Sequence, residues 1–229
     1  QIDVVTLDNL SNGYREAVVG GEFVQGDVAD AELLTRLCAR HEFDAVLHFA
    51  AFMQVGESVV DPAKYYRNNL QGTLSLLDVI VAAGIKRFAF SSRAAILGEP
   101  TYTPIDERHP KVPINPYGLS KWMVEQVLAD YDRAYGLKSI ALRYFNAAGA
   151  DPEGRLGERH EPETHLIPLV LQAASGRRPS ITIFGTDYPT VDGTCVRDYI
   201  HIVDLCQAHM RALDRMRARG KSDAFNLGN

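Results

Sequence analysis

A strand, a helix and a second strand follow one another between residues 87 and 146, and this succession constrains the fold more than any other feature of the sequence. Residues 87–90 form an apolar segment of strand length that ends in two serines. A helical pattern of apolar residues runs from Pro116 to about Gly136, with proline in the first turn, where a helix tolerates it. Residues 139–146 form the second strand. The order predicts a βαβ unit whose strand ends face one crevice.

Segments on either side extend this unit into a larger sheet. Residues 44–51 form a nearly continuous apolar run, which is typical of a parallel strand covered on both faces, and residues 2–8 form an apolar strand that ends in an acid. The alternation of strands and helices stops where a polar loop follows the βαβ unit. We therefore predict an α/β fold with a doubly wound, Rossmann-like parallel sheet in residues 1–146. A smaller substrate lobe, interleaved with strands that return to the sheet, is predicted in residues 147–229.

Tyr117 and Lys121 lie four residues apart at the beginning of the predicted helix. This spacing puts both side chains on one face, so the ammonium group can influence the tyrosine hydroxyl group. A phenol has a pKa of about 10, and its use as a base near neutral pH needs a shift of roughly 3 units, or about 4 kcal/mol. A nearby ammonium group, and any other positive charge beside the ring, would favour the phenolate. The pair predicts proton transfer; the alternative is a tyrosine ring packed on a lysine side chain.

Composition narrows the classes of partner. The chain has 24 basic and 29 acidic residues and a formal net charge of −5, which argues against a surface for nucleic acid or anionic membranes. No stretch approaches the roughly 20 apolar residues of a membrane span. The three cysteines are scattered and lack metal-ligand spacing, so we predict reduced thiols, a cytoplasmic protein and no metal site.

Several motifs together resemble one known family. They are the Tyr117/Lys121 helix, His48-Phe49-Ala50-Ala51, Val55-Gly56-Glu57-Ser58, Arg143-Tyr144-Phe145-Asn146 and the segment from Asp192 to His201. These residues are similar to those of the UDP-glucose 4-epimerases, which are extended short-chain dehydrogenases/reductases. The resemblance implies tightly bound NAD, interconversion of UDP-galactose and UDP-glucose through a 4-keto sugar, and a homodimer. It also implies that Tyr117 is the catalytic base, and that Lys121 lowers its pKa and binds the nicotinamide ribose.

The resemblance also implies binding roles for residues at strand ends and in the loops that follow them. For NAD these are Asp8, Asn9, Asp27, Val28, Phe49, Ala50, Ala51, Met53, Asn68, Ser91, Tyr117, Lys121, Tyr144 and Phe145. For the UDP-sugar they are Asn146, His165, Leu166, Phe184, Arg197 and Tyr199. An acid in the position of Asp8 binds the adenosine ribose and selects NAD over NADP. Arg197 would pair with the diphosphate; the alternative is an ion pair with Asp198 or Asp204.

Arg93 is the largest departure from the family pattern. It occupies the position where relatives have a serine or threonine that relays the proton of the sugar 4′-hydroxyl group to the tyrosine. Arginine has no acceptor and stays protonated in proteins, so it cannot relay that proton. It also adds a cation beside Lys121, unless its long side chain turns to solvent. Leu97 likewise replaces an aromatic residue of the family. We expect the fold to persist and turnover to suffer.

Both ends of the chain differ from those that the family resemblance implies, and two alternative functions remain open. No glycine-rich phosphate-binding turn precedes Asp8, and family members continue beyond Asn229, so we expect a fragment that lacks both ends. One alternative is a catalytically silent protein that binds NAD or a UDP-sugar. The other is a different nucleotide-sugar epimerase or a 4,6-dehydratase, although dehydratases of this superfamily place an Asp-Glu pair after the strand that here ends in Ser92-Arg93.

Overall fold

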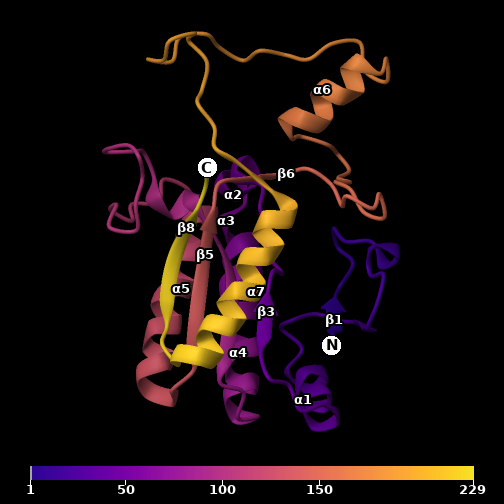
Figure 1. Cartoon of the computed structure of the whole chain (residues 1–229), viewed down its shortest axis with the longest axis vertical. Coiled ribbons are helices and arrows are strands. Elements are labelled where there is room, and N and C mark those ends of the chain that lie inside the picture. Colours follow the sequence, from indigo (N-terminus) through magenta and orange to yellow (C-terminus); the bar gives the residue numbers. More distant parts are fainter. Residues whose placement is uncertain (1) are drawn as a thin grey trace. The chain divides into compact units, whose positions relative to one another are not determined.

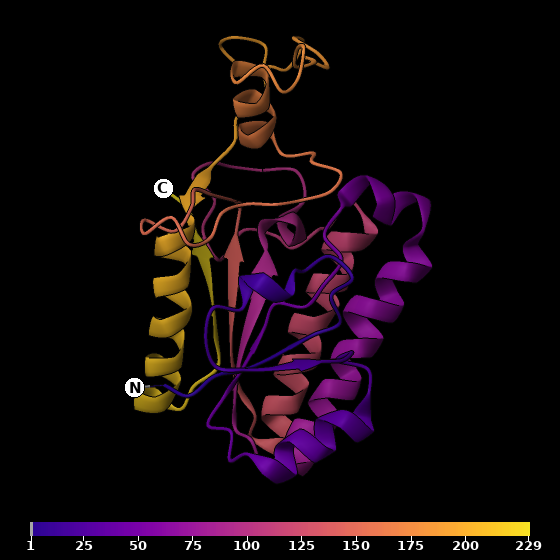
Figure 2. The ribbon, with the colours of Figure 1, turned by 90° about the vertical axis from the view of Figure 1, so that its right-hand side faces the viewer.

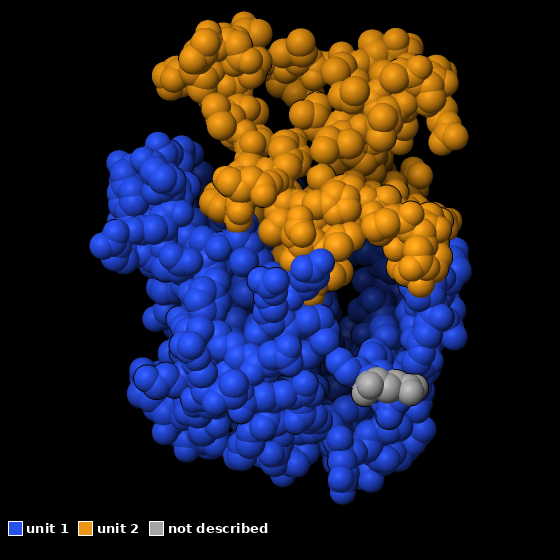
Figure 3. All heavy atoms as spheres, in the orientation of Figure 1, with its two compact units in different colours: residues 1–144, 207–227 blue, residues 145–206, 228–229 orange. Residues whose placement is uncertain are grey.

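The structure, a computed structural model, describes residues 2–229. Figure 1 shows its elements, and Figure 3 distinguishes two compact units. Unit 1 contains the residues up to Tyr144 together with Gln207–Leu227, and unit 2 contains Phe145–Cys206 together with Gly228–Asn229. Within the described residues, no helix is long and apolar enough to cross a membrane.

Unit 1 is built on parallel strands. Its main sheet has the order β3 (Val46–His48), β4 (Arg87–Arg93), β5 (Lys138–Tyr144) and β8 (Asp223–Leu227), and every neighbouring pair is parallel. A separate parallel pair consists of β1 (Val5–Asp8) and β2 (Glu22–Gln25). Among residues 2–229, β1 pairs only with β2, and β3 only with β4.

Helices connect these strands. In chain order they are η1 (Arg15–Ala17), α1 (Ala31–Arg40), α2 (Val55–Val60), α3 (Pro62–Tyr65), η2 (Tyr66–Gln71), α4 (Gly72–Ala82), η3 (Ala94–Leu97), α5 (Pro116–Tyr135), α6 (Leu166–Ala174) and α7 (Ile202–Arg219). Figure 2 shows α7 on one side of the main sheet and α4 and α5 on the other. This arrangement of parallel strands with helices on both faces confirms the predicted α/β fold.

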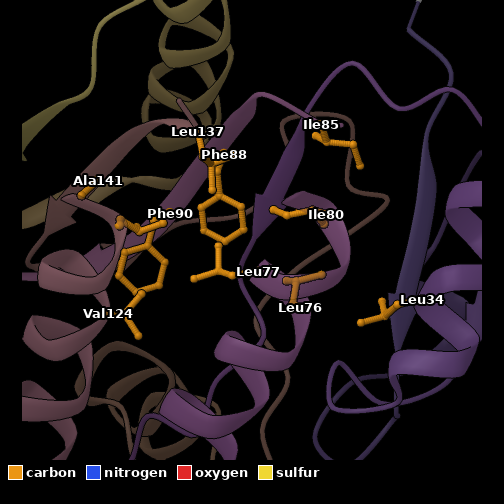
Figure 4. Packing of buried hydrophobic residues seen from close by; sticks show 11 residues of the cluster. Leu34, Leu76, Leu77, Ile80, Ile85, Phe88, Phe90, Val124, Leu137 and Ala141 are labelled. Atoms are coloured by element: carbon orange, nitrogen blue, oxygen red, sulfur yellow. The ribbon is translucent and has the colours of Figure 1, made fainter. Parts of the chain in front are cut away.

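The alternation of side chains along β4 explains the two-sided core. Phe88 and Phe90 point to one face, where they join a buried cluster with Leu77 of α4 (Figure 4). Ala89 points to the opposite face and packs in a second cluster with Met216 of α7. Successive residues of a strand face opposite sides, so a strand buried on both faces is apolar at every position. This accounts for the continuous apolar runs in the sequence.

The ends of α5 follow from local sequence. The Asn115 side chain accepts a hydrogen bond from the backbone N–H of Gly118 at 2.8 Å, and Pro116 occupies the first turn. These are the residue types that stabilise a helix N-terminus. At the other end, Gly136 adopts φ of 69°, a left-handed conformation that glycine tolerates best. The sequence therefore fixes where Tyr117 enters the helix.

The helical region from residue 62 to residue 82 is not a single α-helix. It divides into α3, the π-helical segment η2 and α4. The Asn69 side chain, within η2, binds the backbone of Phe52 through an accepted bond of 2.8 Å and a donated bond of 2.9 Å. A π-helical turn commonly marks a functional position, and here it carries a side chain that fixes the loop after β3.

Unit 2 contains a short parallel pair and one helix. β6 (Asn146–Ala148) pairs with β7 (Tyr199–His201), and Asn146 is the register partner of Tyr199. The helix α6 begins directly after His165, which is its N-cap residue. The segment between β6 and α6 is polar and mostly exposed.

Candidate active site

Tyr117 is buried at the first turn of α5, with 4% of its surface exposed. The next residue, Gly118, lies so close to the backbone of η3 that an added Cβ would be 2.5 Å from the Ala95 carbonyl oxygen. The helix can therefore approach the end of β4 only because residue 118 lacks a side chain. The edge of the Tyr65 ring also contacts Tyr117, with ring centroids 6.3 Å apart.

Lys121, one helical turn further along, is also 4% exposed. Its Nζ donates a hydrogen bond to the Ser91 carbonyl oxygen at 3.0 Å and lies 4.8 Å from the centre of the Phe90 ring. Burial, reinforced by the Arg93 charge and partly opposed by Glu125, lowers the pKa of Lys121 to about 7. This amino group is thus poised to change its charge near neutral pH.

Burial raises the pKa of Tyr117 to about 12. The charge that opposes this rise is that of Arg93, whereas Tyr144 adds to it. From the sequence, this lowering effect was expected of Lys121. In the structure, the Lys121 ammonium group is directed to the Ser91 carbonyl, and its own pKa is near neutrality, so its charge contributes less than the helical spacing suggests.

Arg93 lies close enough to Tyr117 and Lys121 for its charge to affect both groups. It is half-buried at the end of β4, and its Cζ lies 5.2 Å from the centre of the Tyr144 ring on β5. The Tyr144 hydroxyl group in turn is hydrogen-bonded to Ser91 Oγ at 2.6 Å. Five of the predicted residues therefore lie together, namely Ser91, Arg93, Tyr117, Lys121 and Tyr144. They come from the ends of β4 and β5 and the first turns of α5, as the βαβ unit requires.

A buried ion pair between Glu125 and Arg143 lies near Lys121, and it was not predicted from the sequence. Glu125 Oε2 lies 2.5 Å from Arg143 Nη2, and both side chains are 6% exposed. Ser92 Oγ donates a hydrogen bond of 2.6 Å to Glu125 Oε1. The available signal was helical spacing, because Glu125 follows Lys121 by four residues, as Lys121 follows Tyr117.

The residues predicted to bind adenosine also lie together. Asn9 Nδ2 donates a hydrogen bond of 2.8 Å to Asp27 Oδ2, and Asp8, next to Asn9, accepts one of 2.6 Å from the Leu10 N–H. An added Cβ at Gly13 would be 3.1 Å from the Asp8 carboxylate oxygens. The ends of β1 and β2 therefore present two carboxylates and an amide, a suitable set of partners for ribose hydroxyl groups and an adenine amine. Val28 follows Asp27 and is half-buried.

The predicted loop after β3 is largely open to solvent. Phe49 and Met53 are 56% and 42% exposed, Ala50 is exposed and Ala51 is half-buried. The Phe49 ring lies 4.7 Å from that of His209. Asn68 donates a hydrogen bond of 2.9 Å to Asn69, the side chain that binds the backbone of this loop. Asn69 was missed, although its position next to Asn68 in the sequence was a signal.

His48, in β3, is a buried core residue. Its Nε2 lies 2.9 Å from Thr73 Oγ1, and burial lowers the pKa of the imidazole to about 3. The ring stacks on Phe90 with centroids 6.0 Å apart. A neutral imidazole held in this way fixes the position of β3 against α4.

The residues predicted to bind the UDP-sugar belong to unit 2, and Phe145 is its first residue. Asn146 Nδ2 donates a hydrogen bond of 2.8 Å to the Asp198 carbonyl oxygen, beside Tyr199. Arg197 is exposed, and in the described part of the chain it donates to the Val196 carbonyl oxygen and forms no ion pair with either Asp198 or Asp204. Among residues 2–229, no hydrogen bond or ion pair joins the remaining predicted residues, His165, Leu166 and Phe184, to these strands, and Phe184 is 97% exposed.

The sequence of the chain matches a known protein family. Residues 1–228 match the model of the NAD dependent epimerase/dehydratase family. A UDP-glucose 4-epimerase of Rhizobium meliloti (strain 1021) is 57% identical over 224 residues, which are 98% of this chain and 68% of that protein. The chain therefore spans about two thirds of this relative's length.

Solved structures agree with this relationship. UDP-glucose 4-epimerase from Brucella ovis, in complex with NAD, is 51% identical and superposes with a TM-score of 0.95 over 98% of this chain and 69% of that one. The enzyme from Bifidobacterium longum, in complex with NAD+ and UDP, is 39% identical with a TM-score of 0.92, covering 99% of this chain and 70% of that one. The relatives named here are UDP-glucose 4-epimerases, and the chain belongs to the NAD dependent epimerase/dehydratase family.

Proposed function

We propose that this chain carries out the reaction of a UDP-glucose 4-epimerase, the interconversion of UDP-galactose and UDP-glucose through a 4-keto sugar. The observation that carries the proposal is the placement of Tyr117 and Lys121, buried on one face of α5, at the ends of β4 and β5. The 57% identity to a UDP-glucose 4-epimerase supports the choice of substrate.

The residues at the ends of β1 and β2 fit NAD. Asp8 offers a carboxylate to a ribose diol, and the absence of a side chain at Gly13 leaves room beside that carboxylate. A 2′-phosphate next to Asp8 would meet a like charge, which favours NAD over NADP. When bound, NAD+ would supply a hydride acceptor for the sugar C4 and, once reduced, a hydride donor for the opposite face of the 4-keto sugar. The residues that would hold NAD are the predicted NAD-binding residues that belong to unit 1.

Proton transfer is the task of Tyr117. Its phenolate oxygen takes the proton of the sugar 4′-hydroxyl group; burial opposes this ionised form of Tyr117, and the Arg93 charge favours it. Lys121 holds its ammonium group against the Ser91 carbonyl and can bind a ribose hydroxyl group there. A positive charge on the bound nicotinamide would favour the phenolate further.

A second candidate function rests on Arg93. A guanidinium group at the position of a proton relay donates hydrogen bonds but accepts none. With this residue half-buried beside Tyr144, a protein that binds NAD and a UDP-sugar without turnover is the alternative. The two functions differ in one result, because both predict binding and only the first predicts product.

The test measures the conversion of UDP-galactose to UDP-glucose. The chain as it stands is compared with a chimera that adds the parts of the Rhizobium meliloti relative outside the matched region. In whichever form converts substrate, Tyr117→Phe should lower kcat at least about 100-fold, because it removes the acid-base group. Tyr135→Phe, at the exposed end of the same helix, is the control and should leave kcat unchanged. Unchanged kcat in Tyr117→Phe would refute the mechanism, and binding without product in both forms would support the silent protein.

Two further expectations from the sequence remain proposals for this chain. The homodimer implied by the resemblance is tested by sedimentation of the purified protein. A cytoplasmic location is supported by the scattered, unpaired cysteines, Cys38, Cys195 and Cys206.

A further inference from the structure

Two histidines and two glutamates converge in the polar segment before α6. They are Glu158, His160, Glu163 and His165, and one potential ligand atom from each lies within 4.8 Å of all the others. All four belong to unit 2 and come from eight consecutive residues. None of them takes part in the proton transfer proposed for Tyr117.

The distances between these atoms match the spacing of ligands around one small cation. His165 Nδ1 lies 2.8 Å from Glu163 Oε1 and 3.1 Å from Glu158 Oε1. His160 Nδ1 lies 3.4 Å from Glu158 Oε1 and 3.8 Å from Glu163 Oε2. Ligands about 2.1 Å from a tetrahedral Zn²⁺ are separated by about 3.4 Å, so the four atoms need only small shifts to surround an ion.

Two carboxylates beside one imidazole make a cation at this position favourable. The Glu163 side chain is 9% exposed and already accepts the backbone N–H groups of Thr164 and His165, each at 2.8 Å. A second carboxylate, from Glu158, lies against the same imidazole nitrogen, and carboxylates in such proximity repel each other without a cation. Among the described residues, His160 Nδ1 is buried and has no hydrogen-bond partner, although it faces both carboxylates. A metal ion would satisfy this nitrogen.

We propose that Glu158, His160, Glu163 and His165 bind one divalent transition-metal ion of the Zn²⁺ type. Imidazole nitrogen with carboxylate oxygen suits Zn²⁺ better than Mg²⁺, which prefers oxygen ligands and retained water. Four protein ligands leave no open position, so the site is structural. Because His165 is the N-cap residue of α6, the ion would fix the segment 158–165 at the beginning of this helix.

This site differs from the sequence-based prediction of no metal. That prediction considered the cysteines, whose spacing gives no ligand set, and treated His165 as a substrate contact. The Glu-x-His-x-x-Glu-x-His spacing was the signal, and only the folded segment shows that all four side chains turn toward one point. The proposal does not depend on epimerase activity.

The test uses untagged protein stripped with a chelator, with the exposed Cys195 and Cys206 replaced by serine to remove thiol ligands. Titration calorimetry with Zn²⁺ should give one bound ion per chain, and Mg²⁺ should not compete. Co²⁺ in the same protein should give visible absorption of a tetrahedral site. No stoichiometric binding of Zn²⁺ would overturn the proposal, as would loss of binding caused by the cysteine replacements alone.

Single substitutions test which residues bind the metal ion. His160→Ala and Glu158→Gln should each weaken Zn²⁺ binding at least about tenfold. Zn²⁺ should also raise the Tm of the parent protein and lose this effect in both variants, because only binding to the folded state stabilises it. His41→Ala is the matched control, since His41 Nε2 also lies beside a glutamate, 3.3 Å from Glu22 Oε2, outside the cluster. Equal affinity in His160→Ala, Glu158→Gln and His41→Ala would overturn the proposal.

Discussion

The guanidinium carbon of Arg93 lies 5.2 Å from the centre of the Tyr144 ring, so the arginine side chain is held inside the candidate active site. Its charge lowers both the pKa of Tyr117 and that of Lys121. One residue therefore has two opposed effects on catalysis. It favours the tyrosine phenolate, and it occupies the place of a hydroxyl group that could relay the substrate proton.

Replacement of Arg93 by serine tests which effect is larger. We expect Arg93→Ser to convert UDP-galactose at least about tenfold faster, a difference of about 1.4 kcal/mol in barrier, because it restores a hydroxyl relay. The gain should grow with rising pH, since removal of the cation raises the pKa of Tyr117. Rates are measured from pH 6 to pH 10 in the chimera described above.

A control for this comparison is Arg36→Ser, which removes an exposed arginine of α1 and should change nothing. Equal rates for the parent protein and Arg93→Ser would mean that the relay is not limiting. A slower serine variant would show that the cation serves the phenolate more than it obstructs the substrate.

Burial of Lys121 predicts a specific dependence of stability on pH. The pKa of this lysine falls from 10.5 to about 7 on folding, so between these values the unfolded state binds more protons. Its contribution to the free energy of unfolding therefore rises with pH from about 7 to about 10.5 and is least favourable below pH 7. Lys121→Met should remove a slope of up to about 1.4 kcal/mol per pH unit in this window.

Urea unfolding at pH 7.5 and pH 9.5 measures this slope. Lys86→Met, at an exposed lysine, is the control and should keep the slope of the parent protein. Parallel stability curves for Lys121→Met and the parent would contradict the inferred pKa.

The ion pair between Glu125 and Arg143 predicts strong non-additivity. Both side chains are 6% exposed, so removal of one partner leaves a buried charge, at a cost of about 3 to 5 kcal/mol. We expect Glu125→Leu and Arg143→Met each to be destabilised by this amount. The double variant should recover most of the loss, because well-packed apolar residues can replace a buried pair.

A double-mutant cycle from urea unfolding gives the coupling free energy. If the two single losses simply add, the pair does not stabilise the fold as a unit.

The close approach of α5 to η3 predicts that Gly118 cannot be enlarged. An alanine Cβ would be 2.5 Å from the Ala95 carbonyl oxygen, which is backbone and cannot move aside cheaply. Gly118→Ala should therefore lose about 1 to 3 kcal/mol of stability and lower kcat, since the helix carrying Tyr117 must shift. Gly56→Ala is the control, because its Cβ meets nothing within 4 Å, and alanine favours the helix α2. Equal behaviour of the two variants would argue against the steric explanation.

Much of the fold was predictable because its signals are local. The apolar run before Ser91 and the cap formed by Asn115 and Pro116 identify a strand and a helix N-terminus without knowledge of any distant residue. The spacing of Tyr117 and Lys121 then places both on one face. The fold class was confirmed for this reason.

The electrostatics of the site were not predictable in the same way. Lys121 binds a carbonyl oxygen 30 residues away in the sequence, and Glu125 binds Arg143 across to β5. Both the depressed pKa of Lys121 and the raised pKa of Tyr117 come first from burial, which helical spacing does not encode. The Asn69 side chain, in the π-helical segment, likewise accepts a bond from the backbone of Phe52, 17 residues away in the sequence.

The path of the chain between its two units has a consequence for how such a protein can change over evolutionary time. It passes from one unit to the other at Tyr144–Phe145, at Cys206–Gln207 and at Leu227–Gly228. Unit 2 is therefore almost entirely one uninterrupted stretch of the gene, set between two parts of unit 1. Recombination at two points, on either side of residues 145–206, would exchange the segment that contains every predicted UDP-sugar contact. The main parallel sheet and Tyr117 of α5 would remain unchanged.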